Sequence, residues 1–236
     1  GYKMSKEWSA FCYKFIEREG WKTALSGLSA TLRIAVFGLL IGIIIGIIIA
    51  AVRLYPKYKL LPKILSGICN VYVAIFRGTP IVVQLLVGYY VLLPAMGVKL
   101  DSMIVAIIIF GMNSGAYVSE IMRSGMQAVD PGQMEAARAL GLTYNASMMK
   151  IVIPQGIKNI LPTLGNEFIS LIKETSVVSF ITVIDLTKAF KQIGDANYEY
   201  VIPYLMLAAV YLVLVLMITY IIRILERRLS KVDKNR

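Results

Sequence analysis

The chain has 236 residues, of which 58% are hydrophobic and 17% charged, and its formal net charge is +11. A mean hydropathy of +0.70 and long apolar blocks exclude an ordinary soluble domain, where apolar residues make up about 45–50%, and indicate an integral membrane protein with several spans. The sequence has no His, only two Cys and no P-loop motif, which excludes imidazole-dependent catalysis or metal binding and ATP binding through a P-loop of its own.

Residues 1–24 mix charged with aromatic side chains, among them Trp8 and Trp21. Trp and Tyr concentrate at the membrane–water boundary, where basic amphipathic helices also lie. We therefore expect an amphipathic interfacial segment over 1–24, a transmembrane domain over 25–228 and a basic cytoplasmic tail over 229–236. A disordered leader is the alternative for the first segment.

The first span is expected at about 28–54, a block too long for the apolar region of a signal peptide. A small residue recurs at every fourth position of this span, which places these residues on one helix face where another helix can approach closely. The residues are Gly38, Gly42, Gly46 and Ala50. We interpret them as packing positions rather than as a ligand site.

Residues 60–94 are too long for one span of a bilayer core about 30 Å thick. The run from Phe76 to Pro80 supplies a break, since proline disfavours helix in the residue before it. We expect 60–76 to lie along the cytoplasmic face or to enter it obliquely, and the second span to cover about 80–94. Arg77 then either anchors the break at the interface or contacts a substrate carboxylate.

The third, fourth and fifth spans are expected at about 102–122, 157–178 and 201–224. The fourth span has a break near Thr175 and Ser176, and a short polar segment separates it from the fifth. The basic residues flank the apolar blocks, so they indicate membrane topology rather than a nucleic-acid surface.

The positive-inside rule gives the orientation of the spans. Most flanking cations belong to the first loop, the polar loop after the third span and the tail: Arg53, Lys57, Lys59, Lys63, Arg123, Arg138, Lys150, Lys158, Arg223, Arg227, Arg228, Lys231, Lys234 and Arg236. The opposite loops hold only Lys99, Lys188 and Lys191, although the cations of residues 1–24 oppose the rule. Because five spans put the termini on opposite sides, we expect the amino terminus outside and the carboxyl terminus inside.

The polar loop at about 123–156 contains a short helix-prone segment. Asp130 suits an N-cap, Pro131 the first turn and Gly141 the carboxyl-terminal turn. The helix would carry Glu135, Ala136, Ala137 and Leu140 on adjacent positions, and its small alanines would allow close docking in a groove of another protein. An ordinary amphipathic cytoplasmic helix is the alternative.

The spacing E-A-A, three residues, G, nine residues, I-V-I-P resembles the EAA loop of bacterial ABC importer permeases, with Ile153 in place of that family's leucine. Further runs look like permeases of the polar amino-acid uptake branch, which takes up histidine, glutamine or arginine. These runs are G-L-S-A-T-L at 27–32, F-R-G-T-P at 76–80, S-G-A-Y-V-S-E-I-M-R at 114–123 and L-I-K-E-T-S-V-V-S at 171–179.

The resemblance implies the type I ABC importer permease fold, an all-α membrane protein with five transmembrane helices and a cytoplasmic coupling helix. In that family the coupling helix sits in a cleft of the ATP-hydrolysing subunit and transmits its closure to the permease. By this resemblance we expect Glu135, Ala136, Ala137, Gly141 and Pro154 to couple the permease to the ATPase.

Polar groups within spans are costly and indicate a transport pathway by default. On the third span Asn113, Tyr117 and Glu120 share one helix face, and on the fourth Glu167, Ser170 and Glu174 share another. Carboxylates facing a wet cavity would accept the ammonium group of an amino acid. Gln84 is a further candidate for the substrate pathway. The alternative for Glu120 and Glu174 is an ordinary place near the membrane surface.

The function implied is that of a non-catalytic permease subunit of an ATP-driven importer for polar or charged amino acids, in the bacterial cell (inner) membrane. It would hold no cofactor itself, since ATP and Mg bind to a partner ATPase dimer. Its other partners would be a second permease chain, identical or related, an extracytoplasmic binding protein, the amino acid and the lipid bilayer, with no nucleic acid. An ion-gradient-driven secondary carrier is the alternative, although the chain shows no internal repeat.

Overall fold

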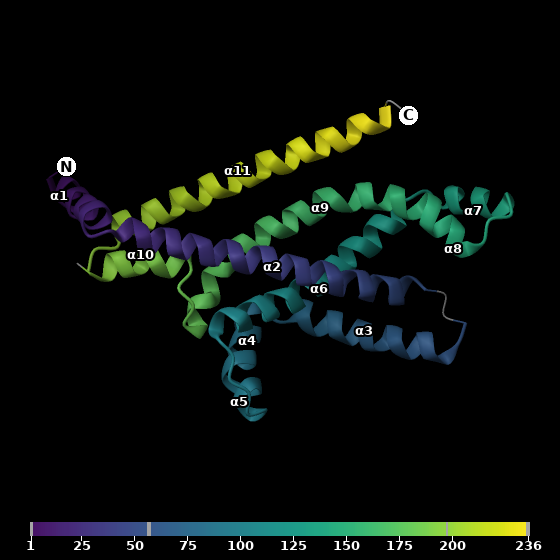
Figure 1. The fold of residues 1–236 in the computed structure, drawn as a ribbon, viewed down its shortest axis with the longest axis horizontal. Helices are drawn as coiled ribbons and strands as arrows, with labels where there is room; N and C mark the ends of the chain where they lie inside the picture. The colour runs from purple at the N-terminus through teal and green to yellow at the C-terminus, as the bar shows by residue number, and fades with distance from the viewer. Residues whose placement is uncertain (1, 56–57, 197, 235–236) are drawn as a thin grey trace. The chain divides into compact units, whose positions relative to one another are not determined.

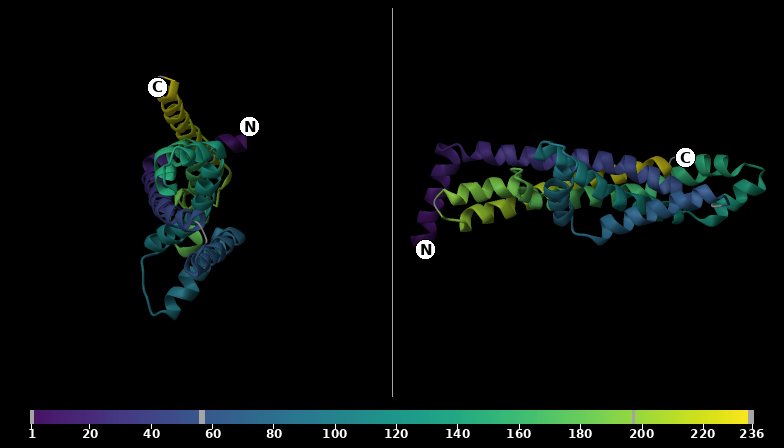
Figure 2. Two further views of the ribbon diagram at one scale, coloured as in Figure 1. Left: turned by 90° about the vertical axis from the view of Figure 1, so that its right-hand side faces the viewer. Right: turned by 90° about the horizontal axis from the view of Figure 1, so that it is seen from below.

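The structure is a computed structural model that describes residues 2–55, 58–196 and 198–234, without the side chains of 2–5 and 229–234 (Figures 1 and 2). Every regular element in these ranges is helical, as expected of an all-α protein. The tail expected over 229–236 lies outside the residues whose side chains are described.

The helices follow one another with short connections. In chain order they are α1 (Tyr2–Cys12), the π turn η1 (Tyr13–Glu17), α2 (Gly20–Leu54), α3 (Leu60–Gly78), α4 (Ile81–Leu86), the π turn η2 (Val87–Leu92), α5 (Leu93–Ala95), α6 (Ser102–Gln127), α7 (Pro131–Ala139), α8 (Tyr144–Ser147), the π turn η3 (Met148–Val152), α9 (Ile153–Glu174), the 3-10 turn η4 (Thr175–Ile181), α10 (Leu186–Asp195) and α11 (Val201–Lys234).

The chain forms two compact units, and α2, α6, α9 and α11 each contribute to both. The first unit consists of Gly1–Gly38, Pro80–Phe110 and Ser170–Ile218, and the second of Leu39–Thr79, Gly111–Ile169 and Thr219–Arg236.

In the first unit, the amino-terminal segment is helical and packs on α10 through Phe11 and Phe15. The rings of Phe15 and Phe190 lie 6.4 Å apart between centroids. The α10 helix begins at Asp185, whose buried carboxylate accepts hydrogen bonds from the N–H groups of Thr187 and Lys188, a normal N-cap arrangement. The expected amino-terminal helix is thus present, and its place in a membrane interface stays a prediction.

In the second unit, α2 and α6 interlock through small residues on both helices. A Cβ atom on Gly42 would lie 2.7 Å from Ser114 Cβ, and one on Gly46 would lie 2.5 Å from Val118 Cγ1. In the opposite direction, Ile41 of α2 fits against Gly111 of α6 in the same way. The interpretation of Gly42 and Gly46 as packing positions is confirmed, because glycine lets the two backbones approach.

Replacing Gly46 by alanine is expected to lower the free energy of unfolding by about 1–3 kcal/mol, since the added methyl group overpacks the contact with Val118. The matched control is Gly67→Ala on α3, where an added Cβ meets nothing within 4 Å. That variant should be neutral or more stable by about 0.5–1 kcal/mol. Thermal unfolding in detergent measures both variants, and an equal response would contradict the close-packing interpretation.

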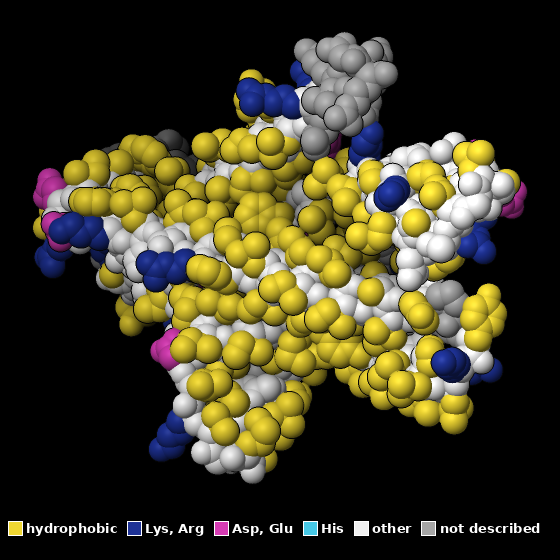
Figure 3. All heavy atoms as spheres, turned by 45° about the vertical axis from the view of Figure 1, so that its right-hand side comes forward, with side chains coloured by type: hydrophobic (Ala, Val, Ile, Leu, Met, Phe, Trp, Pro, Cys, Tyr) yellow, Lys and Arg dark blue, Asp and Glu magenta, His cyan; other side chains and the backbone are white. Residues whose placement is uncertain are grey.

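Among the residues that the structure describes, four helices are long and apolar enough to cross a membrane, namely Gly20–Leu54, Leu60–Gly78, Ser102–Gln127 and Val201–Arg228. Three of them contain the first, third and fifth expected spans. Hydrophobic side chains cover long stretches of the visible face, as lipid-facing helices require (Figure 3).

The helices around residue 78 differ from the sequence-based prediction. The break falls where expected, because α3 ends at Gly78 and α4 follows Pro80. However, α3 is one uninterrupted helix of 19 residues, about 28 Å long, and it rather than the shorter apolar stretch Ile81–Ala95 meets the length of a span. Its two cations, Lys63 and Arg77, lie near its ends, so its middle carries no charge. The count of five spans and the outside amino terminus stay predictions.

Candidate functional site

The coupling helix expected in the polar loop is α7, in the second unit. Its N-cap is Asp130, whose carboxylate accepts a hydrogen bond from the Gly132 N–H at 2.8 Å. Pro131 is the first helical residue, a position where the missing N–H of proline has no cost. Both positions agree with the sequence-based prediction.

The carboxyl-terminal end of α7 is closed by Gly141, which has a positive φ of 85°. The Gly141 N–H donates to the Arg138 carbonyl at 3.0 Å, and the Leu142 N–H donates to the Ala137 carbonyl at 3.2 Å. These two bonds form a Schellman motif, in which glycine is preferred because a Cβ atom is strained at this φ. Gly141 therefore sets the direction in which the chain leaves the helix.

The two sides of α7 differ in exposure. Ala137 is 1% exposed, and the helix packs on α8 and η3 (Figures 1 and 2). Glu135 and Ala136 are exposed, and Leu140 is 85% exposed. An exposed leucine beside a carboxylate and an alanine suits a docking face for another protein. Ala137, by contrast, serves the packing of the helix on its own chain.

Pro154 is the second residue of α9, directly after η3. In η3 the Ile153 N–H donates to the Met148 carbonyl, five residues back. The backbone stays helical from α8 through η3 into α9, so the missing N–H of Pro154 falls just after the π turn rather than at a free helix end. Pro154 thus stands where the loop structure passes into the long helix.

The polar residues of α6 lie against α3 and α9 in the second unit. Asn113 is 4% exposed, and its Nδ2 donates to the Phe76 carbonyl at 3.2 Å. The neighbouring Ser114 hydroxyl donates to Glu167 Oε1 at 3.0 Å. The structure thus joins Glu167 to the Asn113 turn of α6 through Ser114, a residue that sequence reasoning did not select. The sequence signal that could have selected Ser114 was its position next to Asn113 on the third expected span.

Glu120 is surrounded by three arginines. It forms ion pairs with Arg53 of α2, with Arg123 at 2.8 Å and with Arg77 at 3.9 Å. The Arg77 guanidinium also lies 5.4 Å from the centroid of the Tyr117 ring. Glu120 and Arg77 therefore have charged and aromatic partners within the chain, and their contact with a substrate stays a prediction. Sequence reasoning missed this cluster, since Arg53 and Glu120 are 67 residues apart.

Three further candidates belong to the first unit. Gln84 is a half-buried residue of α4, Ser170 is half-buried near the end of α9, and Glu174 is exposed as the last residue of that helix. Just beyond Glu174 the helix changes to η4, at the break expected near Thr175. Their contribution to a substrate pathway stays a prediction.

Among the described residues no group of three or more His, Cys, Asp or Glu could hold a metal ion. The class of protein that emerges is a multi-pass helical membrane protein with a polar loop helix whose exposed side carries Glu135, Ala136 and Leu140.

Comparison with known proteins gives the family. Residues 26–231 match the family described as "Binding-protein-dependent transport system inner membrane component", and the chain belongs to this family.

Curated relatives cover nearly the whole chain. The arginine transport system permease protein ArtQ of Bacillus subtilis is 39% identical over 209 residues, which are 89% of this chain and 93% of ArtQ. The putative glutamine transport system permease protein GlnP of Rickettsia bellii is 38% identical over 205 residues, 87% of this chain and 92% of the relative.

Solved structures share the fold. A crystal structure of an amino acid ABC transporter with histidines aligns with a TM-score of 0.83 at 39% identity, over 90% of this chain and 96% of that one. The inward-facing MetNI methionine ABC transporter aligns with a TM-score of 0.64 at 19% identity, over 89% of this chain and 94% of that one. The expected type I importer permease fold is confirmed.

Proposed function

We propose that this chain is the transmembrane permease subunit of an ATP-driven importer for polar or charged amino acids in a bacterial inner membrane. The observation that carries the proposal is α7, a capped helix with Glu135, Ala136 and Leu140 exposed and a Schellman motif at Gly141. Relatives named for transport of arginine, glutamine and L-cystine support a polar amino acid as the substrate.

The chain itself catalyses no covalent step in this proposal. A partner ATPase dimer binds ATP and Mg, and its closure moves α7, which packs on η3 and so passes the movement to α9. A second permease chain completes the pathway, and an extracytoplasmic binding protein delivers the amino acid. Alternating access around a site within the membrane follows, as in transporters generally. No observation favours the secondary carrier.

In this proposal the transported amino acid contacts polar side chains of the pathway. Glu167 is the strongest candidate, because its carboxylate lies 3.0 Å from the Ser114 hydroxyl on α6 and can accept hydrogen bonds from a cationic group. Asn113 supplies a buried amide on the same helix.

Replacing Glu167 by glutamine should reduce uptake of cationic amino acids about tenfold or more at subsaturating concentration, since a charge-assisted hydrogen bond becomes a neutral one. Assembly of the complex should be unaffected. The matched control is Ser114→Ala, which removes the hydrogen bond at 3.0 Å but keeps the carboxylate, and should alter uptake less. Proteoliposome uptake of a labelled cationic amino acid measures both variants, and wild-type uptake by Glu167→Gln would remove Glu167 from the pathway.

The proposed function is tested by affinity purification of the full chain from membranes, with mass spectrometry of the proteins that copurify. We expect an ATPase subunit to copurify stoichiometrically, and amino-acid-stimulated ATP hydrolysis in the purified complex. If no ATPase copurifies and uptake instead follows an ion gradient, the importer proposal fails and the secondary carrier replaces it.

A further inference from the structure

A basic cavity lies in the first unit, at the amino-terminal end of the chain. It has a volume of about 760 Å³ and lies where α1, η1 and the start of α2 meet α10. Three cations line it, Lys6, Lys14 and Arg18, and no carboxylate of a described residue does so. Neutral polar side chains complete the lining, among them Tyr13, Thr23 and Gln192. This composition suits an anion that accepts several hydrogen bonds.

The ammonium group of Lys14 has no hydrogen-bond acceptor within the described part of the chain. Its Nζ is buried and has no hydrogen-bond partner there. Glu7 and Glu199 line a smaller hollow that Lys14 also borders, yet neither forms a hydrogen bond with its Nζ. An unpaired buried charge is costly, and an anionic oxygen in the cavity would remove that cost. Burial and the nearby charge of Arg18 lower the pKa of Lys14, as expected of a cation without an anion.

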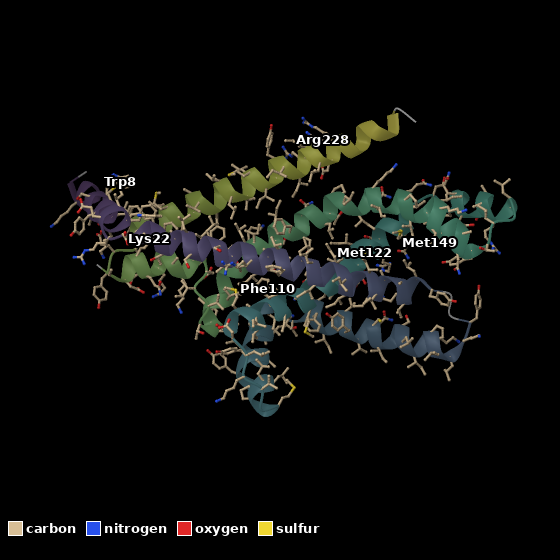
Figure 4. All side chains as sticks on the ribbon, viewed as in Figure 1. Trp8, Lys22, Phe110, Met122, Met149 and Arg228 are labelled. Carbon is tan, nitrogen blue, oxygen red and sulfur yellow. The ribbon has the colours of Figure 1, made fainter. Side chains whose placement is uncertain are left out.

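Exposed aromatic and aliphatic side chains on the same segment indicate that the anion belongs to a membrane surface. Trp8, Tyr13, Ile16 and Trp21 are all more than 40% exposed on the segment that carries the three cations. Trp8 lies on α1, and the labelled Lys22 lies near the start of α2 (Figure 4). Exposed Trp and Tyr next to lysines are the composition of a segment at the level of lipid headgroups.

We propose that this cavity binds the phosphate group of an anionic phospholipid, with Lys14 and Arg18 as its principal contacts. The positive charge of the lining complements the phosphate, and the exposed aromatic side chains rest in the headgroup region of the same leaflet. The three cations of the lining lie before residue 26, where the family match begins, whereas Gln192 and Ile193 of the lining lie within it. The proposal does not depend on which amino acid is transported.

The test is native mass spectrometry of the delipidated full chain in detergent, titrated with phosphatidylglycerol, with phosphatidylcholine and with inorganic phosphate. We expect one tightly retained phosphatidylglycerol and no comparable phosphatidylcholine. Lys14→Gln should weaken its retention about tenfold or more, because a charge-assisted hydrogen bond is lost. Arg18→Gln should also weaken retention of the lipid. Because Arg18 is exposed, this second variant tests the site even if Lys14→Gln misfolds.

The matched control is Lys22→Gln, which removes a cation from the same segment but not from the cavity. Lys22 is already paired with Glu19 at 2.6 Å, so its loss should weaken retention by less than about threefold. Equal losses in Lys14→Gln and Lys22→Gln would overturn the site and leave only general surface attraction. Equal retention of both lipids would also overturn it. Displacement of the lipid by millimolar inorganic phosphate, which itself remains bound, would overturn the assignment to a lipid.

Discussion

Replacing Gly141 by tryptophan is expected to reduce amino-acid-stimulated ATP hydrolysis in the assembled transporter about tenfold or more. A non-glycine residue at φ 85° costs about 1–2 kcal/mol, enough to reduce the population of the closed Schellman turn about tenfold. An added Cβ meets nothing within 4 Å, so the strain arises in the backbone and the indole projects outward beside the exposed Leu140. Hydrolysis and copurification of the ATPase subunit are measured together.

Gly141→Asn is the matched control, since asparagine tolerates a left-handed conformation and has a small side chain. It should retain most of the stimulated hydrolysis. Glu135→Lys, at an exposed position on the docking face, is expected to uncouple hydrolysis from transport without strain in the turn. Unchanged stimulated hydrolysis in both Gly141→Trp and Glu135→Lys would remove α7 from the coupling mechanism.

Local structure in the polar loop was predictable because short-range chemistry decides it. Asp130 and Pro131 determine where α7 begins, and Gly141 determines where it ends, each through contacts within a few residues. The break after Gly78 was predictable for the same reason, since Pro80 restricts the residue before it.

Contacts between distant parts of the chain were less predictable. Periodicity placed Ala136 and Ala137 together on one helix, but only the packing of α7 shows that Ala137 is buried while Ala136 is exposed. Likewise, the sequence did not predict that residues 60–78 form one uninterrupted helix, which makes α3 long enough to cross a membrane. The partners of Glu120 come from three helices, and no local rule brings Arg53 to it.

The cluster around Glu120 leads to the largest expected effect on stability. Glu120→Gln leaves Arg53, Arg77 and Arg123 without their shared anion. Glu120 is 17% exposed and Arg53 is 18% exposed, so this pair is largely shielded from water, whereas Arg77 and Arg123 are more exposed. Removing one partner of a buried ion pair costs about 3–5 kcal/mol, and partial exposure places this site near the lower end. Thermal unfolding of the purified chain in detergent measures the loss.

Two further variants distinguish a structural role of Glu120 from contact of Glu120 with the substrate. Glu19→Gln breaks an exposed ion pair with Lys22 and should cost less than about 1 kcal/mol. Adding Arg53→Gln to Glu120→Gln removes both charges of the shielded pair and should restore part of the lost free energy, as coupled neighbours do. If Glu120→Gln unfolds like wild type but transports cationic amino acids poorly, Glu120 belongs to the substrate pathway and its ion pairs do not stabilise the fold. A stability loss that Arg53→Gln relieves assigns Glu120 to holding α2, α3 and α6 together.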